Sequence, residues 1–343
     1  MRKYLTRLAS TAAFLLAAFA GSAVAQETLK LRIADSFPSG HFIGRFAVQP
    51  FIERVKELSN NTIEFEYYPA EQLGKAKDLL ALAQSGVIDI AYVGPSYVSD
   101  KMPLSAVAQL PGLFQTACEG TKAYWKIVKD GELGKIEFAK NGVVPIFGIV
   151  LPPYQIFSRS RPLDSVASFS GLKLRTTGGA MDLMAGKLGA VPVRLAAPDV
   201  YEAISRGTLD GLIFPWSSVL AYDVGGQVKH ATSGENFGSF VATYLISDAK
   251  WQQLPEAARE VIAKAGEETV LGACEKIDQD EAGAIAKLKE MGIEIKELPE
   301  AEKQKVSELL AGVAEEWATD LDGQSRAGTT VLTEFREALT AGK

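Results

Sequence analysis

The chain has 343 residues, of which 47% are apolar and 23% are charged, and 36 basic against 42 acidic side chains give a net charge of −6. This composition excludes an intrinsically disordered chain, and the acidic balance argues against nucleic acid or an anionic membrane surface as a partner. With only two histidines and two cysteines, the sequence predicts no metal centre and no cofactor.

The segment 1–25 has the pattern of a secretory signal peptide. A basic start with Arg2, Lys3 and Arg7 precedes an apolar run at 12–20, and small residues at 23–25 form a cleavage signal. Elsewhere no stretch approaches the roughly 20 apolar residues that a membrane span needs, and no cysteine follows the cleavage site to carry a lipid. We therefore predict a soluble, exported protein without a membrane anchor, and we expect a monomer.

Cys118 and Cys274 are the two cysteines of the chain. Export into an oxidising compartment permits a disulfide between them, but the sequence does not say whether their Cα atoms come within bonding range. A disulfide and a pair of buried free thiols both stay open.

Strand and helix patterns alternate through the first part of the chain. Period-two alternation of apolar residues predicts strands, and apolar residues at three-and-four spacing predict helices. In chain order we expect a strand at 29–33, a helix at 43–58, a strand at 63–67, a helix at 78–85 and a strand at 88–93. Pro50 must either kink the first helix or lie in the first turn of its second half.

The same alternation continues to about residue 214. The expected elements are strands at 143–150, 172–175 and 212–214, and helices at 181–188 and 199–205. Strands that alternate with helices predict an α/β fold with parallel layers rather than a β-sandwich.

Beyond residue 255 the pattern is helical, with one stretch at 255–291 and a second at about 300–340. A helix of some 35 residues is about 50 Å long. Because this length exceeds one small domain, we expect the helix to bridge two domains.

Segments 78–98 and 199–219 align with each other without gaps. Each reads as a helix, a glycine turn, a short strand with an aspartate, and a loop with proline, serine and an aromatic residue. Two similar α/β domains around a central cleft would explain this internal similarity. Each copy would place its loop at the carboxyl end of a strand, where open α/β sheets bind ligands. Chance recurrence of Gly-x-x-Asp turns is the alternative.

The predicted boundaries are 26–151 plus 241–280 for domain I and 152–240 plus 281–343 for domain II.

Catalytic motifs are weak. The run Gly94–Val98 resembles a nucleophile elbow but lacks its second glycine, and there is no Walker loop. We therefore predict a protein that is not an enzyme, with an exported serine hydrolase that uses Ser96 or Ser217 as the alternative.

The run Asp278–Gly283 has calcium-loop spacing, but Lys289 occupies the position of the final ligand, and we interpret the run as a solvated helix face.

The segment 171–179 reads as a strand that ends in Arg175, then a glycine-rich turn, then the start of a helix. An arginine at the carboxyl end of a strand, beside free helix N–H groups, offers a carboxylate two parallel donors. Arg175 is thus a candidate carboxylate-binding residue, with an ordinary exposed surface arginine as the alternative.

Several short motifs, taken in their order and spacing, carry a family resemblance. They are Ala34-Asp35 to His41, Pro69-Ala70-Glu71-Gln72-Leu73-Gly74, Gly86-x-x-Asp89, Pro103-Leu104, Leu110-Pro111-Gly112-Leu113-Phe114, Ser158-Arg159-Ser160-Arg161-Pro162-Leu163, Gly171-Leu172-Lys173-Leu174-Arg175 and Gly207-x-x-Asp210-Gly211. Over essentially the whole chain after the signal peptide, the sequence resembles the solute-binding proteins of tripartite ATP-independent periplasmic (TRAP) transporters, of the dicarboxylate-binding type.

This resemblance implies a two-domain clamp of the periplasmic binding protein type, located in the periplasm of a Gram-negative bacterium. The clamp would capture an organic acid, with Arg175 paired to the ligand carboxylate, and deliver it to the TRAP membrane permease subunits. A long helix that crosses both domains is also implied. A sensor subunit that presents its ligand to a membrane kinase is the alternative function.

Two departures from sugar-acid-binding relatives bear on the ligand. Gln155 stands where those relatives usually carry a second ligand-facing arginine, and Phe214, followed by Pro215 and Trp216, replaces a ligand-binding asparagine. A pocket with one guanidinium, an amide and added aromatic surface favours a monocarboxylate with an apolar or aromatic body.

The other candidate ligand-binding residues lie in loops near the expected cleft: Tyr97, Tyr154, Ser96, Trp216, Phe37 and His41. Packing is the alternative for Tyr97, and helix capping is the alternative for His41. We expect Trp216 at the ligand, because a tryptophan beside a proline after a strand is poorly placed for a domain core.

Overall fold

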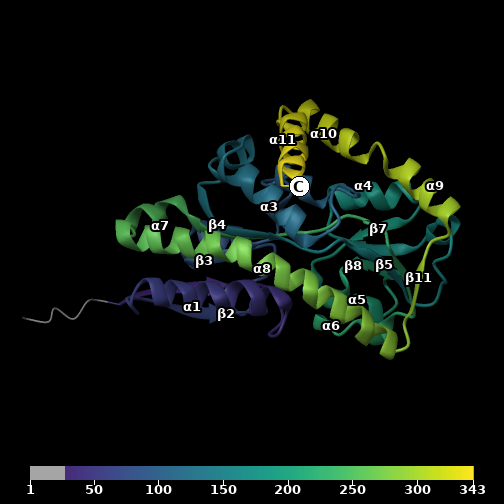
Figure 1. Cartoon of the computed structure of the whole chain (residues 1–343), viewed down its shortest axis with the longest axis horizontal. Coiled ribbons are helices and arrows are strands. Elements are labelled where there is room, and N and C mark those ends of the chain that lie inside the picture. The colour runs from purple at the N-terminus through teal and green to yellow at the C-terminus, as the bar shows by residue number, and fades with distance from the viewer. Residues whose placement is uncertain (1–27, 343) are drawn as a thin grey trace, which may run out of the picture.

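The structure is a computed structural model that describes residues 28–342, so the predicted signal peptide lies outside the described residues. The described chain forms two mixed sheets with helices packed around them, and the long helix α8 runs past both sheets (Figure 1). We call the elements around the five-stranded sheet the first lobe and those around the six-stranded sheet the second lobe. This is the two-lobed α/β architecture that the sequence predicts.

The sheet of the first lobe has the order β2-β1-β3-β10-β4. Its strands are β1 (Leu29–Ala34), β2 (Ile63–Tyr68), β3 (Ile90–Val93), β4 (Val143–Val150) and β10 (Val241–Ser247). The strands β2, β1 and β3 are parallel, whereas β10 runs antiparallel to β3 and β4.

The sheet of the second lobe has the order β11-β9-β5-β8-β6-β7. Its strands are β5 (Gln155–Ser158), β6 (Lys173–Thr176), β7 (Val191–Arg194), β8 (Gly211–Phe214), β9 (His230–Ser233) and β11 (Glu294–Glu297). Here β5 is antiparallel to β8 and β9, and the other pairs are parallel. The expectation of purely parallel layers was therefore wrong at β5 and β10. Each is the first strand after the chain has crossed between the lobes, so no helical crossover turns it parallel to its neighbours.

Among the described residues, the sequence predicted four of the seven α-helices before α8 and missed those at 117–129, 216–221 and 248–253. The seven helices are α1 (Gln49–Leu58), α2 (Leu79–Gln84), α3 (Ala117–Lys129), α4 (Ala180–Lys187), α5 (Val200–Ser205), α6 (Trp216–Ala221) and α7 (Asp248–Gln253). Short 3-10 turns occur at Pro95–Val98, Leu104–Gln109, Val166–Phe169, Ala197–Asp199 and Gly225–Gln227, and π-turns at Gly44–Val48 and Gly134–Phe138. Pro50 lies in the first turn of α1, where its missing N–H breaks no helical hydrogen bond.

The helix α8 (Glu256–Glu290) has 35 residues and crosses the molecule, as predicted. It packs on α1, α3 and β4 of the first lobe and on α6 of the second lobe (Figure 1). The stretch predicted as helical at 300–340 forms three helices, α9 (Glu300–Leu310), α10 (Val313–Gly323) and α11 (Gly328–Ala341). Ser325, with a φ of +58°, ends the second of them. The domain boundaries stay a prediction.

A disulfide joins Cys118 at the start of α3 to Cys274 on α8, with the Cα atoms 4.7 Å apart. It decides between the two alternatives that the sequence left open.

Within residues 28–342, no helix combines the length and the apolar composition that crossing a membrane requires.

Candidate ligand-binding site

Arg175 lies near the carboxyl end of β6, just before the glycine-rich turn into α4. Its side chain is 1% exposed, which excludes the surface-arginine alternative. Nε donates to Leu195 O at 2.9 Å, Nη1 to Ile213 O at 3.5 Å and Nη2 to Tyr97 OH at 3.3 Å. The guanidinium carbon lies 4.5 Å from the centre of the Phe214 ring, so that ring supports the charge from one side.

The charge of Arg175 has no anionic partner within the described chain. Between residues 28 and 342, every ion pair within 4.0 Å involves other side chains, and the hydrogen-bond and stacking partners of Arg175 are carbonyl groups, tyrosine hydroxyls and an aromatic ring. A buried, unpaired charge is costly, and natural proteins keep one chiefly where a ligand supplies the counter-charge.

Tyrosine hydroxyls flank the guanidinium. Tyr97 stands on the first-lobe turn Pro95–Val98, and its oxygen accepts hydrogen bonds from Arg175 and from Ala197 N at 3.1 Å, both in the second lobe. Burial raises the pKa of Tyr154 far above its ordinary value, whereas the charge of Arg175 and a hydrogen bond from it act in the opposite direction. Arg175, Tyr97, Tyr154 and Phe214 therefore form one cluster.

Phe37 and His41 stack on each other in the loop after β1, with ring centres 4.5 Å apart. Nδ1 of His41 accepts a hydrogen bond from Ile43 N at 3.2 Å, and Nε2 lies 3.3 Å from Ser218 Oγ in the second lobe. Burial, with a smaller effect from Arg45, lowers the pKa of His41 to about 3, so the ring is neutral. His41 thus organises the loop and touches the opposite lobe, which agrees with the capping alternative.

Three other candidate residues have protein partners of their own. Trp216 lies in the second-lobe core, with its ring centre 5.0 Å from that of Phe157 in an edge-on arrangement, and its placement favours packing. The Gln155 amide oxygen accepts from Thr232 Oγ1 at 3.0 Å, and its nitrogen donates to Glu235 O. The Ser96 hydroxyl donates to the side-chain oxygen of Gln109.

Tyr92 and Tyr222 were missed by the sequence reasoning. The Tyr92 ring lies 4.6 Å from that of Phe37. The Tyr222 ring lies 5.6 Å from His41 and 5.7 Å from Phe214, so it joins the Phe37–His41 pair to the Arg175 cluster. No motif marks either tyrosine, since each depends on contacts between residues far apart in sequence.

The acidic run on α8 is not a solvated helix face, and that interpretation was wrong. Asp278 accepts hydrogen bonds from Ala117 N and Cys118 N at 2.7 and 3.1 Å, which caps α3. Glu281 accepts from Trp216 N at 2.5 Å and from Ser217 N at 3.0 Å, which caps α6. We call residues 274–281, including the disulfide at Cys274, the α8 anchor segment.

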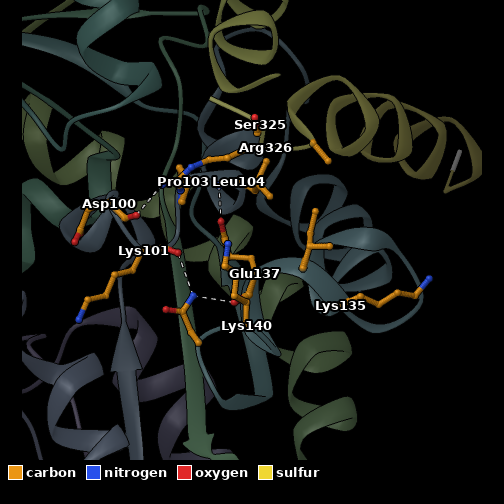
Figure 2. Close-up of a pocket in the computed structure, with 12 residues that line it drawn as sticks. Asp100, Lys101, Pro103, Leu104, Lys135, Glu137, Lys140, Ser325 and Arg326 are labelled. Carbon is orange, nitrogen blue, oxygen red and sulfur yellow. Dashed lines mark hydrogen bonds between the residues drawn. The ribbon is translucent and has the colours of Figure 1, made fainter. Parts of the chain in front are cut away.

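A separate cavity of about 610 Å³ lies on the first lobe, where the turn before α11 meets Leu104–Gln109 and Gly134–Phe138. Figure 2 shows Glu137 directed at the backbone of Leu104 and Lys135 directed away from it. Glu137 also accepts from Ser105 N at 2.8 Å, and Arg326 donates to Asp100 O at 3.0 Å. Protein partners thus satisfy the buried Glu137 carboxylate, whereas the Arg326 contact is exposed, so among the described residues this cavity presents no buried, unpaired charge like that of Arg175.

The chain is similar to known binding proteins over most of its length. It shares 27% identity over 310 residues with the C4-dicarboxylate-binding periplasmic protein DctP of Rhodobacter capsulatus, which covers 88% of this chain and 89% of that protein. A crystal structure of a TRAP solute-binding protein from Rhodoferax ferrireducens with copurified benzoate has a TM-score of 0.85 at 24% identity, covering 92% of this chain and 98% of that one.

A second solved structure, a marine metagenome TRAP solute-binding protein with co-crystallised 3-hydroxybenzoate, has a TM-score of 0.86 at 23% identity, covering 92% and 99% of the two chains. At these identities the two structures establish the fold alone. The model of the family described as "Bacterial extracellular solute-binding protein, family 7" matches residues 33–320. The chain therefore belongs to this family, the DctP-type TRAP solute-binding proteins, which bind their solutes without transforming them, as the sequence predicts.

Proposed function

We propose that this protein binds a small monocarboxylic acid with an apolar or aromatic body in the bacterial periplasm and delivers it to a TRAP permease. The single observation behind the proposal is the buried Arg175 guanidinium, which has no carboxylate partner within residues 28–342 and is surrounded by aromatic side chains.

A carboxylate is the chemical group that best complements this guanidinium. It neutralises the charge and accepts parallel hydrogen bonds from the planar fork of donors. Phe214 already covers one face of the guanidinium, and Gln155 adds no second charge. The surroundings therefore favour one carboxylate joined to an apolar body over a polyhydroxylated acid.

Closure of the lobes on the acid follows from the position of Tyr97. This residue links its own lobe to Arg175 and Ala197 of the other. An acid that pairs with Arg175 would bind the closed arrangement better and shift the population towards it. The permease would then distinguish closed from open protein. The benzoate and 3-hydroxybenzoate bound by the two solved relatives support an aromatic acid.

The test is a thermal-shift screen of aromatic monocarboxylates, keto acids and sugar acids, followed by calorimetry of the acids that bind. Ligand at 100 times Kd should add about 2.7 kcal/mol of stability. Arg175→Ala should weaken binding by about 3–5 kcal/mol, because it breaks a buried ion pair.

Arg206→Ala is the matched control, since this arginine of the same lobe is exposed and pairs with Glu202 on the surface. Its affinity should equal that of the unmodified protein. Unchanged affinity in Arg175→Ala would refute the role of Arg175. Binding of uronic or sialic acids alone would refute the proposed ligand class.

A further inference from the structure

Tyr222 follows α6 in the second lobe and lies where loops of the two lobes meet. Its ring contacts His41 of the first lobe and Phe214 of its own lobe. The hydroxyl oxygen is buried and has no hydrogen-bond partner in the part of the chain that the structure describes. A buried hydroxyl without a partner loses its bonds to water and gains none in return, so its presence calls for an explanation.

Three other tyrosine hydroxyls of the described chain have protein partners. Those of Tyr67 and Tyr244 each donate to Asp35 Oδ2 at 2.8 Å, and that of Tyr124 donates to Ser105 Oγ at 3.0 Å. Tyr222 differs from all three because no group between residues 28 and 342 satisfies it. The exception coincides with the cluster that holds the unpaired guanidinium.

We propose that Tyr222 is a further ligand-binding residue, whose hydroxyl donates a hydrogen bond to the carboxylate that pairs with Arg175. This inference rests on the proposed function. A carboxylate has about four lone-pair sites, and a guanidinium fork fills two of them. A neutral phenol can therefore add a third donor to the same anion without a further charge.

The electrostatic surroundings of Tyr222 agree with this role. Burial keeps its pKa far above the ordinary value, so the hydroxyl is a neutral donor. Among its neighbours, Tyr97 and Tyr154 also raise the pKa, whereas Arg175 lowers it. Tyr222 and Arg175 both contact the Phe214 ring, which keeps the two side chains in one cluster. Because Tyr222 also touches His41 of the first lobe, its bond to the ligand would favour the closed arrangement.

The variant Tyr222→Phe tests the inference, since it removes only the hydroxyl. Calorimetry with benzoate and with 3-hydroxybenzoate should show Kd raised about tenfold or more for both acids, as expected for a lost hydrogen bond to a charged group. The thermal midpoint of the ligand-free protein should stay the same or rise, because the hydroxyl has no partner to lose among residues 28–342. Tyr124→Phe is the matched control, in which the midpoint should fall and both Kd values should stay unchanged.

Unchanged Kd for both acids in Tyr222→Phe would overturn the proposal. A loss confined to 3-hydroxybenzoate would also overturn it, since the hydroxyl would then meet the ring substituent and not the carboxylate. Failure of the unmodified protein to bind either acid would remove the proposed aromatic ligand, and this inference with it. That outcome differs from the other two because it appears before any substitution is made.

Discussion

The Arg175 cluster and the α8 anchor segment both place polar groups where elements of the two lobes meet, and they differ in how those groups are satisfied. In the segment, both oxygens of Asp278, Asp280 and Glu281 accept hydrogen bonds from protein donors. In the cluster, Arg175 has no carboxylate and the Tyr222 hydroxyl has no partner within residues 28–342.

The difference distinguishes polar groups that stabilise the fold from polar groups that are available to bind a ligand. Satisfied buried groups stabilise the ligand-free protein, whereas unsatisfied ones cost stability until a ligand arrives. Substitutions of the buried groups of the anchor segment should therefore change the free energy of unfolding and leave the ligand Kd unchanged. Substitutions of Arg175 or Tyr222 should raise the ligand Kd and should not lower the free energy of unfolding.

The disulfide gives the largest expected effect on stability. The double variant Cys118→Ser/Cys274→Ser frees a loop with a sequence separation of 156 residues in the unfolded chain. We expect the free energy of unfolding to fall by about 2–5 kcal/mol, measured by denaturant titration. Calorimetry with benzoate should give the Kd of the unmodified protein. A clear loss of affinity in the double variant would contradict the comparison, because the α8 anchor segment would then contribute to the ligand-binding site.

Glu281 provides a pH test of intermediate size. Burial raises its pKa from 4.5 to about 7, although its hydrogen bonds oppose the shift. The folded protein therefore binds a proton more tightly than the unfolded chain. This contribution to stability is full below pH 4.5 and is lost as the pH rises through 7, by up to about 1.4 kcal/mol per pH unit.

Glu281→Gln should reduce that slope, measured as the thermal midpoint between pH 4.5 and 8. Some slope should remain, because burial also raises the pKa of Glu137 to about 7 and that of Asp35 to about 6. An unaltered slope in Glu281→Gln would contradict the assignment of the proton to this carboxyl group.

Asp280 gives the smallest effect. Both its oxygens lie 2.8 Å from Arg45 Nη2, but the two side chains are 24% and 47% exposed. Solvent screening limits such a pair to about 0–1 kcal/mol, so Asp280→Asn should scarcely change the denaturation midpoint. A loss as large as that of the disulfide variant would show that exposure is a poor guide to the anchoring contacts.

Much of the architecture could be predicted because it depends on local pattern. Sequence pattern located strands β1, β2, β3, β4, β6 and β8 and helices α1, α2, α4 and α5, and the composition after residue 255 predicted the length of α8. Strands β5, β7, β9, β10 and β11 and helices α3, α6 and α7 were not predicted. The antiparallel strands β5 and β10 could not be predicted, since direction in a sheet depends on where the chain enters it. Motif order was sufficient to identify the family.

The candidate site divides in the same way. Arg175 could be predicted because a strand end, a glycine turn and a helix start are adjacent in sequence. Tyr97 could be predicted because segments 78–98 and 199–219 are similar and each ends in a loop with an aromatic residue. The expectation that Trp216 contacts the ligand stays a prediction, and Phe157 offers the indole a packing partner from β5. No local signal marked Tyr222.

The sequence by itself determined the family, the alternating α/β elements and a strand-end arginine suited to a carboxylate, because each depends on residues close together in the chain. Only the tertiary structure decided which polar groups remain unpaired. Hydrogen-bond satisfaction depends on partners tens to hundreds of residues away, such as Tyr97 for Arg175 and Trp216 for Glu281. Asp278 and Glu281 of α8 therefore became helix caps, while Arg175 kept a charge without a counter-ion among residues 28–342.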